Sequence, residues 1–274
     1  IGVLVPWRIA FVLFGASGLL GAVALLAMGR EPARQEQAAA RRRAPGAAEA
    51  GFMWRNRAIL LPLYLGFATC FTVAYGAASW APTMLIRTYG ADVTFLAAWL
   101  GPLSMLFSIA GTLIGGTLLD RSMRASAPMT RMTILAAAPL CAVPSVMAVL
   151  AGDRHLAGLL VASSNAVFSV VGTVMLATLQ SIVPQRMRGS AVALTLVLNT
   201  ILGATLGPLM IASLTQRVLH DETMVGWSIA AICLPCLILA SGLFALAWRA
   251  MHRARATGTG ECARLLDAEI ADRH

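Results

Sequence analysis

The stretch VGWSIAAICLPCLILASGLFALAWRAM, residues 225–251, holds a single charged residue, Arg249. A helix needs about 20 apolar residues to cross roughly 30 Å of hydrocarbon, so this stretch is long enough to span a membrane. Similar stretches predict six further helices, over residues 7–28, 57–86, 92–119, 130–151, 156–183 and 189–217. They lack the alternation of barrel strands, so the sequence predicts an all-α, polytopic membrane protein with seven transmembrane helices.

The composition excludes a soluble domain, because only 12% of the residues are charged and 58% are hydrophobic, whereas soluble domains carry about 25% charged residues. The net charge of +9 would suit nucleic acid. The arginines, however, lie between the apolar stretches, so we expect anionic membrane lipid as their partner and no nucleic acid. No H-E-x-x-H, G-x-S-x-G or P-loop pattern is present. We therefore expect no enzyme activity, no cofactor and no metal site.

The chain contains 21 arginines and no lysine, and arginine-rich segments alternate with arginine-poor ones. The rich segments hold Arg30, Arg34, Arg41, Arg42, Arg43, Arg55, Arg57, Arg121, Arg124, Arg131, Arg186, Arg188, Arg249, Arg253, Arg255, Arg264 and Arg273; the poor ones hold Arg8, Arg87, Arg154 and Arg217. Cationic loops stay on the cytoplasmic side of a membrane. The alternation predicts an integral protein of the bacterial inner (plasma) membrane, with its linker and C-terminus in the cytoplasm.

The seven predicted spans divide into one and six. A helix within residues 1–29 is followed by a basic cytoplasmic linker, residues 30–56, then by six helices within 57–252 and by a polar tail, 253–274. We expect the tail to lack any segment that anchors it firmly. The chain begins inside an apolar segment and without Met, so we expect further helices of an N-terminal half to precede Ile1.

Glycines indicate where helices approach closely. Gly111 and Gly115 form one G-x-x-x-G pattern, and Gly203 and Gly207 form another. Small residues at this spacing let two helix backbones come together. The same two predicted helices contain the Gly-Pro pairs 101–102 and 207–208, where we expect a kink or a break.

No Asp, Glu, His or Arg lies at the centre of a predicted span, so we expect no titratable coupling site there. Neutral polar and aromatic side chains do occur at depth, and such groups must face protein or water. Interhelical hydrogen bonds, worth about 0.6 kcal/mol each, are one interpretation; the lining of a substrate cavity is the other. The cavity candidates are Thr72, Tyr75, Trp80, Asn165, Ser169, Thr173 and Asn199.

Two loop motifs resemble those of the major facilitator superfamily. GTLLDRSMR, residues 116–124, resembles the G-x-L-x-D-R-x-G-R loop and departs from it at Met123. PQRMRGSA, residues 184–191, resembles the P-x-x-x-R-G-x-A loop that opens the eleventh helix. Within the superfamily, Tyr75-Gly76, Trp80-Ala81-Pro82, residues 180–184 and Asn199 look most like spinster-like transporters, whereas aromatic-acid and hexuronate symporters share only the general frame.

The resemblance implies a partial major facilitator fold, in which 1–29 is the last helix of the first half and 57–252 the whole second half. It implies alternating-access secondary transport of a small organic solute or lipid-like metabolite, driven by ion coupling. An aromatic-acid or other organic-anion symporter is an alternative, and a transport-inactive scaffold or receptor-like bundle is an alternative of another class. The resemblance assigns a cytoplasmic gate to Gly116, Asp120, Arg121, Arg124, Pro184, Arg188 and Gly189. We hypothesise that Asp120 pairs with Arg188 or caps a neighbouring helix when that gate is closed; alternatively, both charges only mark the membrane edge.

Overall fold

The computed structural model describes residues 6–28, 46–124, 129–258 and 261–271. The chain divides into two units, Ile1–Pro45 and Gly46–His274. In the first unit, α1 (Pro6–Met28) forms the helix predicted over 7–28, and its apolar part, Phe11–Ala27, is shorter than the other spans. The greater part of the predicted linker, residues 29–45, lies outside the described residues.

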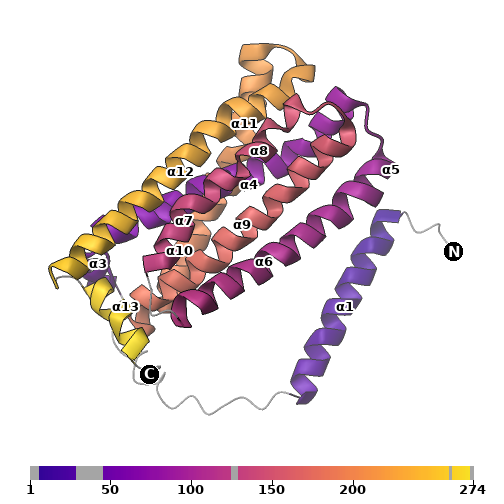
Figure 1. The fold of residues 1–274 in the computed structure, drawn as a ribbon. Helices are drawn as coiled ribbons and strands as arrows, with labels where there is room; N and C mark the ends of the chain where they lie inside the picture. Colours follow the sequence, from indigo (N-terminus) through magenta and orange to yellow (C-terminus); the bar gives the residue numbers. More distant parts are fainter. Residues whose placement is uncertain (1–5, 29–45, 125–128, 259–260, 272–274) are drawn as a thin grey trace. The chain divides into compact units, whose positions relative to one another are not determined.

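Within the described residues of the second unit, six helical segments are long and apolar enough to cross a membrane (Figure 1). They are α4 (Arg57–Tyr89); α5 (Val93–Phe95), η1 (Leu96–Leu100) and α6 (Gly101–Arg124); α7 (Met129–Ala137), η2 (Ala138–Ala142), α8 (Val143–Val146) and η3 (Met147–Leu150); α9 (Arg154–Ile182); η4 (Gln185–Met187), α10 (Arg188–Leu198), η5 (Asn199–Leu206), α11 (Gly207–Leu214) and η6 (Thr215–Leu219); and η7 (Glu222–Met224) with α12 (Val225–Ala256). The predicted all-α architecture is confirmed, and the span boundaries agree to within a few residues.

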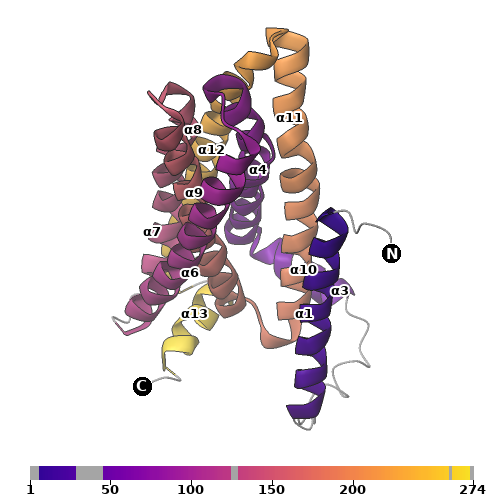
Figure 2. The same ribbon diagram turned by 90° about the vertical axis from the view of Figure 1, so that its right-hand side faces the viewer.

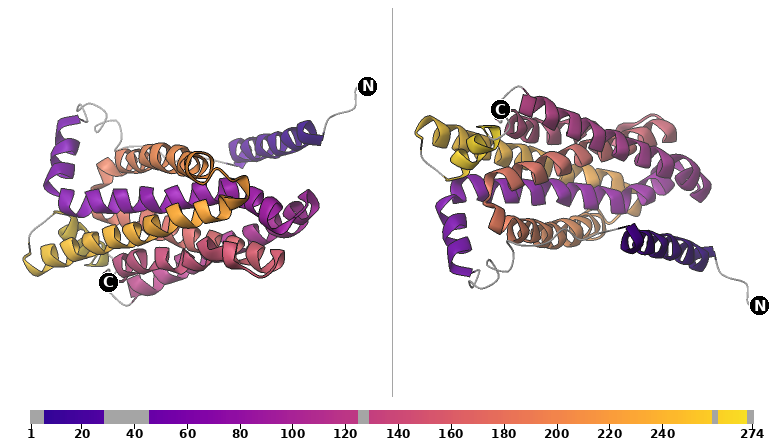
Figure 3. Two further views of the ribbon diagram at one scale, coloured as in Figure 1. Left: turned by 90° about the horizontal axis from the view of Figure 1, so that it is seen from above. Right: turned by 90° about the horizontal axis from the view of Figure 1, so that it is seen from below.

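α4 occupies the middle of the bundle. It packs against α12 and α9 on one side and against η5 and α11 on another. Figure 3 shows α4 between α12 and the α10–α11 segment, and Figure 2 shows α10 and α11 as one long rod beside it. α6 packs along α9, and α7 packs on both α9 and α12.

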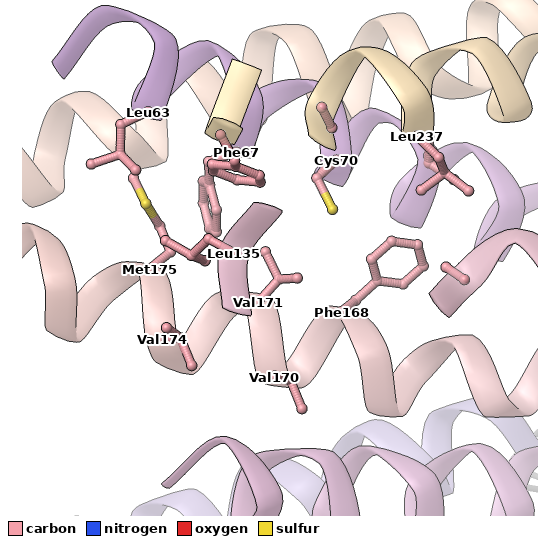
Figure 4. Close-up of a cluster of buried hydrophobic side chains, with 14 of the residues drawn as sticks. Leu63, Phe67, Cys70, Leu135, Phe168, Val170, Val171, Val174, Met175 and Leu237 are labelled. Carbon is pink, nitrogen blue, oxygen red and sulfur yellow. The ribbon is translucent and has the colours of Figure 1, made fainter. Parts of the chain in front are cut away.

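The core lies between α4, α7, α9 and α12 (Figure 4). Leu63 and Cys70 of α4, Leu135 of α7, Met175 of α9 and Leu237 of α12 are fully buried there. Each of these side chains belongs to the buried cluster that the four helices form. Since lipid tails are as apolar as these side chains, close packing rather than water exclusion must hold such a core together.

The two Gly-Pro pairs do not break their helices. Instead, a π-helical segment with wider turns immediately precedes each pair: η1 ends at Leu100 before Gly101-Pro102, and η5 ends at Leu206 before Gly207-Pro208. A proline has no N–H to donate and crowds the carbonyl four residues earlier. A wider turn relieves that crowding while the helix continues, so the expected break becomes a local expansion.

At the arginine-poor end, aspartates cap the starts of three segments. The Asp153 carboxylate accepts a hydrogen bond from the Leu156 N–H at 2.7 Å, and Asp92 accepts one from Phe95 at 3.3 Å. Asp221 accepts from Thr223, and these hydrogen bonds hold the pKa of Asp221 below its usual value. Such caps satisfy amides that a helix start leaves without partners.

At the arginine-rich end, two short helices lie beside the spans: α3 (Gly46–Arg55) and α13 (Glu261–Ala271). α13 packs against α9 and α12 and buries Cys262, Ala263 and Leu266. The expectation of a tail without an anchoring segment is therefore wrong. The tail forms an amphipathic helix whose buried side chains recur at helical spacing and pack against α9 and α12.

Candidate functional site

The second G-x-x-x-G pattern forms the contact between α4 and η5–α11. A Cβ atom added to Gly207 would collide with the backbone carbonyl of Thr72, and one added to Gly76 would lie 3.2 Å from the Gly207 carbonyl carbon. The Thr72 hydroxyl lies 2.9 Å from the Ala68 oxygen and 3.0 Å from the Leu202 oxygen of η5. Here the predicted close approach is confirmed, and we call this contact the α4–η5 seam.

Asn199, the first residue of η5, places an orphan acceptor in this seam. The side chain is 9% exposed, and its Oδ1 has no hydrogen-bond partner within the described part of the chain. A Cβ added to Gly203 would lie 3.0 Å from this oxygen and 3.2 Å from the Tyr75 ring. A buried acceptor without a partner costs about 1–3 kcal/mol. An acceptor held at that cost is a candidate for binding a hydrogen-bond donor of a ligand.

Aromatic rings line the same side of α4. Phe71 lies 4.5 Å from Phe67, 6.1 Å from Tyr75 and 6.3 Å from Phe168 of α9, measured between ring centroids. The Tyr75 side chain is 41% exposed. Trp80 lies further along α4 and donates its indole N–H to the Pro208 oxygen at 3.0 Å. The tilted rings therefore join α9 to the seam. Tyr75, as the exposed ring of the series, is the one that an entering molecule would meet.

The other three cavity candidates lie on α9. The hydroxyls of Ser169 and Ser108 are 3.0 Å apart, and Thr173 packs 3.1 Å from the position of a Cβ on Gly115. Both residues thus contribute to the contact between α6 and α9, which is the interhelical interpretation of the sequence. Asn165 is half-buried and donates to the Ala162 oxygen of its own helix at 3.1 Å. The structure brings Thr72, Tyr75 and Asn199 together in the seam and places Trp80 further along it, at Pro208. It leaves the three residues of α9 apart from them.

The gate residues lie at the arginine-rich end. Asp120, Arg121 and Arg188 are all exposed, and no ion pair joins Asp120 to Arg188 among the residues that the structure describes. The hypothesised pairing is therefore not formed in this structure. Pro184 begins the turn η4, where its oxygen accepts the Met187 N–H at 2.8 Å. Gly116 and Gly189 have open space around them, and the side chain of Arg124 lies outside the described part.

Sequence reasoning missed one buried cation at that end, Arg131. Arg131 is 3% exposed and donates to the Ser122 hydroxyl at 3.4 Å and to the Ser181 hydroxyl at 3.2 Å. It therefore ties the start of α7 to the ends of α6 and α9. Arg131 counted only as an orienting charge, although its spacing of four residues from the buried Leu135 places both on one helix face. That spacing was the available signal.

Comparisons with known proteins identify the family of the chain. A family model of the Major Facilitator Superfamily matches residues 1–208. An MFS-type efflux pump of Mycolicibacterium smegmatis is 29% identical over 221 residues, which cover 78% of this chain and 49% of that protein. The chain thus spans about half the length of this curated relative.

Two solved structures share the fold. Both are crystal structures of a bacterial homologue of the human lysosomal transporter Spinster in an inward-facing conformation. The unoccupied form gives a TM-score of 0.62 at 23% identity, over 90% of this chain and 60% of that one. The occupied form gives 0.54 at 20% identity, over 92% and 58%.

Proposed function

Because this chain belongs to the Major Facilitator Superfamily, we propose that it forms the second half of a secondary transporter that moves a small organic solute or lipid-like metabolite by alternating access. Its family and fold are those of transporters rather than of enzymes. We further propose that ion coupling drives the movement, and that a preceding half completes the cavity and carries the titratable groups. The printed name of the Mycolicibacterium relative, an efflux pump, supports export as the direction to test first.

We propose that the substrate binds at the α4–η5 seam, because the Asn199 Oδ1 lies there beside Tyr75 without a hydrogen-bond partner among the described residues. An amide oxygen at this depth accepts a hydrogen bond, and the aromatic rings around it favour an apolar body. The site therefore suits a molecule that has a hydroxyl or amine donor on an apolar frame. Asn165, Ser169 and Thr173 remain predicted cavity residues, in a secondary place because each has a partner within the bundle.

The orientation is part of the same proposal. We place the arginine-rich end, with α3 and α13, in the cytoplasm of a bacterial cell, in contact with anionic lipid of the inner membrane. At this end Asp120, Arg121 and Arg188 are free to rearrange, because they are exposed and carry no ion pair among the described residues. We propose that the cytoplasmic gate closes when these three side chains rearrange.

Solute movement in proteoliposomes tests the function. The complete transporter is reconstituted, a proton or sodium gradient is imposed, and a panel of ethidium, Hoechst dye and small organic acids is followed. We expect at least one member to move against its concentration gradient, and Asn199→Leu to slow it at least tenfold. If no panel member responds to either gradient, the proposal is contradicted. If transport is unchanged in Asn199→Leu, the seam is the wrong site.

A further inference from the structure

The outer face of α12 carries an apolar groove with a volume of about 500 Å³. Its lining includes Ile238, Leu239, Gly242 and Leu246, and Arg249 closes one end. These residues recur every three or four positions, so they lie on one face of the helix. α12 runs along the edge of the bundle in Figure 1.

Gly242 makes the notch in this face. A Cβ added there would meet nothing within 4 Å. The neighbouring side chains of Ile238, Leu239 and Leu246 are 57%, 55% and 53% exposed. The opposite face of α12 is buried in the bundle, where Phe244 packs against α4. A shallow apolar channel between projecting branched side chains is a surface that fits a hydrocarbon chain.

The length of the groove matches one membrane leaflet. Residues 238 to 249 span about 16 Å along the helix at a rise of about 1.5 Å per residue. A leaflet occupies about half of the roughly 30 Å hydrocarbon thickness. Arg249 stands at the arginine-rich end of the groove, and Arg253, also exposed, follows one turn later. The groove therefore begins at a cationic boundary and ends near mid-membrane.

We propose that this groove binds one anionic phospholipid, with an acyl chain in the notch at Gly242 and its phosphate on Arg249. The site is separate from the α4–η5 seam and does not depend on transport. It rests on the orientation proposed above only for the choice of the cytoplasmic leaflet. Anionic lipid fits better than zwitterionic lipid because the groove carries the cationic charge of Arg249 at its head end.

Native mass spectrometry of the purified protein tests the site, with phosphatidylglycerol and phosphatidylcholine as the two probes. We expect wild type to retain one phosphatidylglycerol after delipidation and to bind it at least tenfold more tightly than phosphatidylcholine. Gly242→Leu fills the notch and Arg249→Gln removes the charge, so each should lower phosphatidylglycerol retention at least tenfold. Circular dichroism and gel filtration confirm that both variants remain folded.

Matched controls add the same bulk or remove the same charge elsewhere. Ala231→Leu enlarges another exposed position of α12, and Arg186→Gln removes an exposed arginine of η4; both should retain the lipid as wild type does. Equal retention of the two lipids, or unchanged retention in Gly242→Leu and Arg249→Gln, overturns the proposal. So does a result in which Gly242→Leu changes the oligomeric state and not the lipid, because the groove would then hold a second copy of the chain.

Discussion

At the scale of single residues, two buried polar side chains, Arg131 and Asn199, differ in their hydrogen-bond partners. Arg131 holds its charge in a site with two serine hydroxyls, whereas the Asn199 Oδ1 has no partner among the described residues. The sequence indicated that Asn199 was polar and deep in a span, and it could not indicate whether the amide had a partner. That depends on which donors lie near the Oδ1 once α4 packs against η5, which is a property of the packed helices.

Asn199→Leu should leave the free energy of unfolding unchanged or raise it. Replacing an unpartnered buried amide by an apolar group of similar volume removes a desolvation cost of about 1–3 kcal/mol. Thermal unfolding in detergent measures this. The control is Asn56→Leu, because Asn56 is equally buried but donates to the Phe52 oxygen at 3.0 Å; its loss should cost about 1 kcal/mol. A large drop for Asn199→Leu would mean that the amide has a structural partner.

Arg131→Gln should destabilise the protein by about 2–3 kcal/mol, because hydrogen bonds from a charged donor contribute about 1.5–3 kcal/mol. Arg131→Lys should restore little, since a single ammonium cannot reach two hydroxyls in the fixed geometry of a guanidinium. The matched surface change, Arg186→Gln, should stay within about 0.5 kcal/mol. Equal melting temperatures for Arg131→Gln and Arg186→Gln would show that Arg131 does not hold the three helix ends together.

At the scale of elements, the sequence predicted the spans well because the length of an apolar run and the charges at its ends are local properties. It predicted the G-x-x-x-G contacts for the same reason, since glycine spacing fixes a smooth helix face. It did not predict the π-helical segments or the docking of α13. The Gly-Pro pairs indicated where a helix would be disturbed, but not that it would continue through a wider turn. The docking of α13 depends on the surfaces of α9 and α12 that it meets.

Gly111→Ala should destabilise the contact between α6 and α9 by about 1–3 kcal/mol, the usual cost of overpacking. The added Cβ would collide with the backbone of Ala166, which cannot move as a side-chain tip does. Gly116→Ala, five residues along the same helix, meets nothing within 4 Å and should be neutral. Comparison of the two melting temperatures tests this. Similar values would show that the helices separate easily at Gly111.

The docking of α13 should make the reactivity of the Cys262 thiol depend on pH. Burial, followed by the charge of Glu261, raises the pKa of Cys262 to about 12. The pKa of Cys262 is higher in the folded state than in the unfolded state. The protonated thiol therefore contributes fully to the stability of the docked helix below about pH 9, and this stability is lost as the pH rises toward 12. Maleimide labelling of Cys262, followed by peptide mass spectrometry, should be slow at pH 7 and accelerate steeply above pH 9.

Leu266→Glu places a charge in the docked face of α13 and should expose Cys262 already at pH 7, because an unpaired buried charge is costly. The fully exposed Arg264→Glu change on the same helix provides the control and should leave labelling slow. Rapid labelling of wild type at pH 7 would show that α13 is not docked in solution.

At the scale of the whole molecule, the distribution of charge between the two ends of the bundle is the property read most directly from the sequence. Arginines mark one end, and the other carries the capping aspartates Asp92, Asp153 and Asp221 together with the ion pair between Arg87 and Glu222 at 2.9 Å.

Trypsin applied to sealed vesicles of known sidedness tests the orientation, since it cleaves only after arginine in a chain without lysine. In inside-out vesicles we expect peptides that end in the tail at Arg255 and Arg264. In right-side-out vesicles we expect cleavage only at the arginine-poor end, near Arg87, Arg154 and Arg217. The reverse pattern would place the arginine-rich end outside the cell.

The π-helical segment η5 has a consequence for insertions and deletions. A turn that closes five residues apart contains one residue more than a regular α-helical turn over nearly the same path. The segment 199–206 therefore contains one residue more than a regular α-helix would need over the same length. Deleting Ala204 would let η5 close as a regular α-helix and leave Gly207 facing α4, whereas deleting one residue from the regular part of α9 would rotate everything beyond it by about 100°. Of these two helices, only the one with η5 should tolerate a shorter chain.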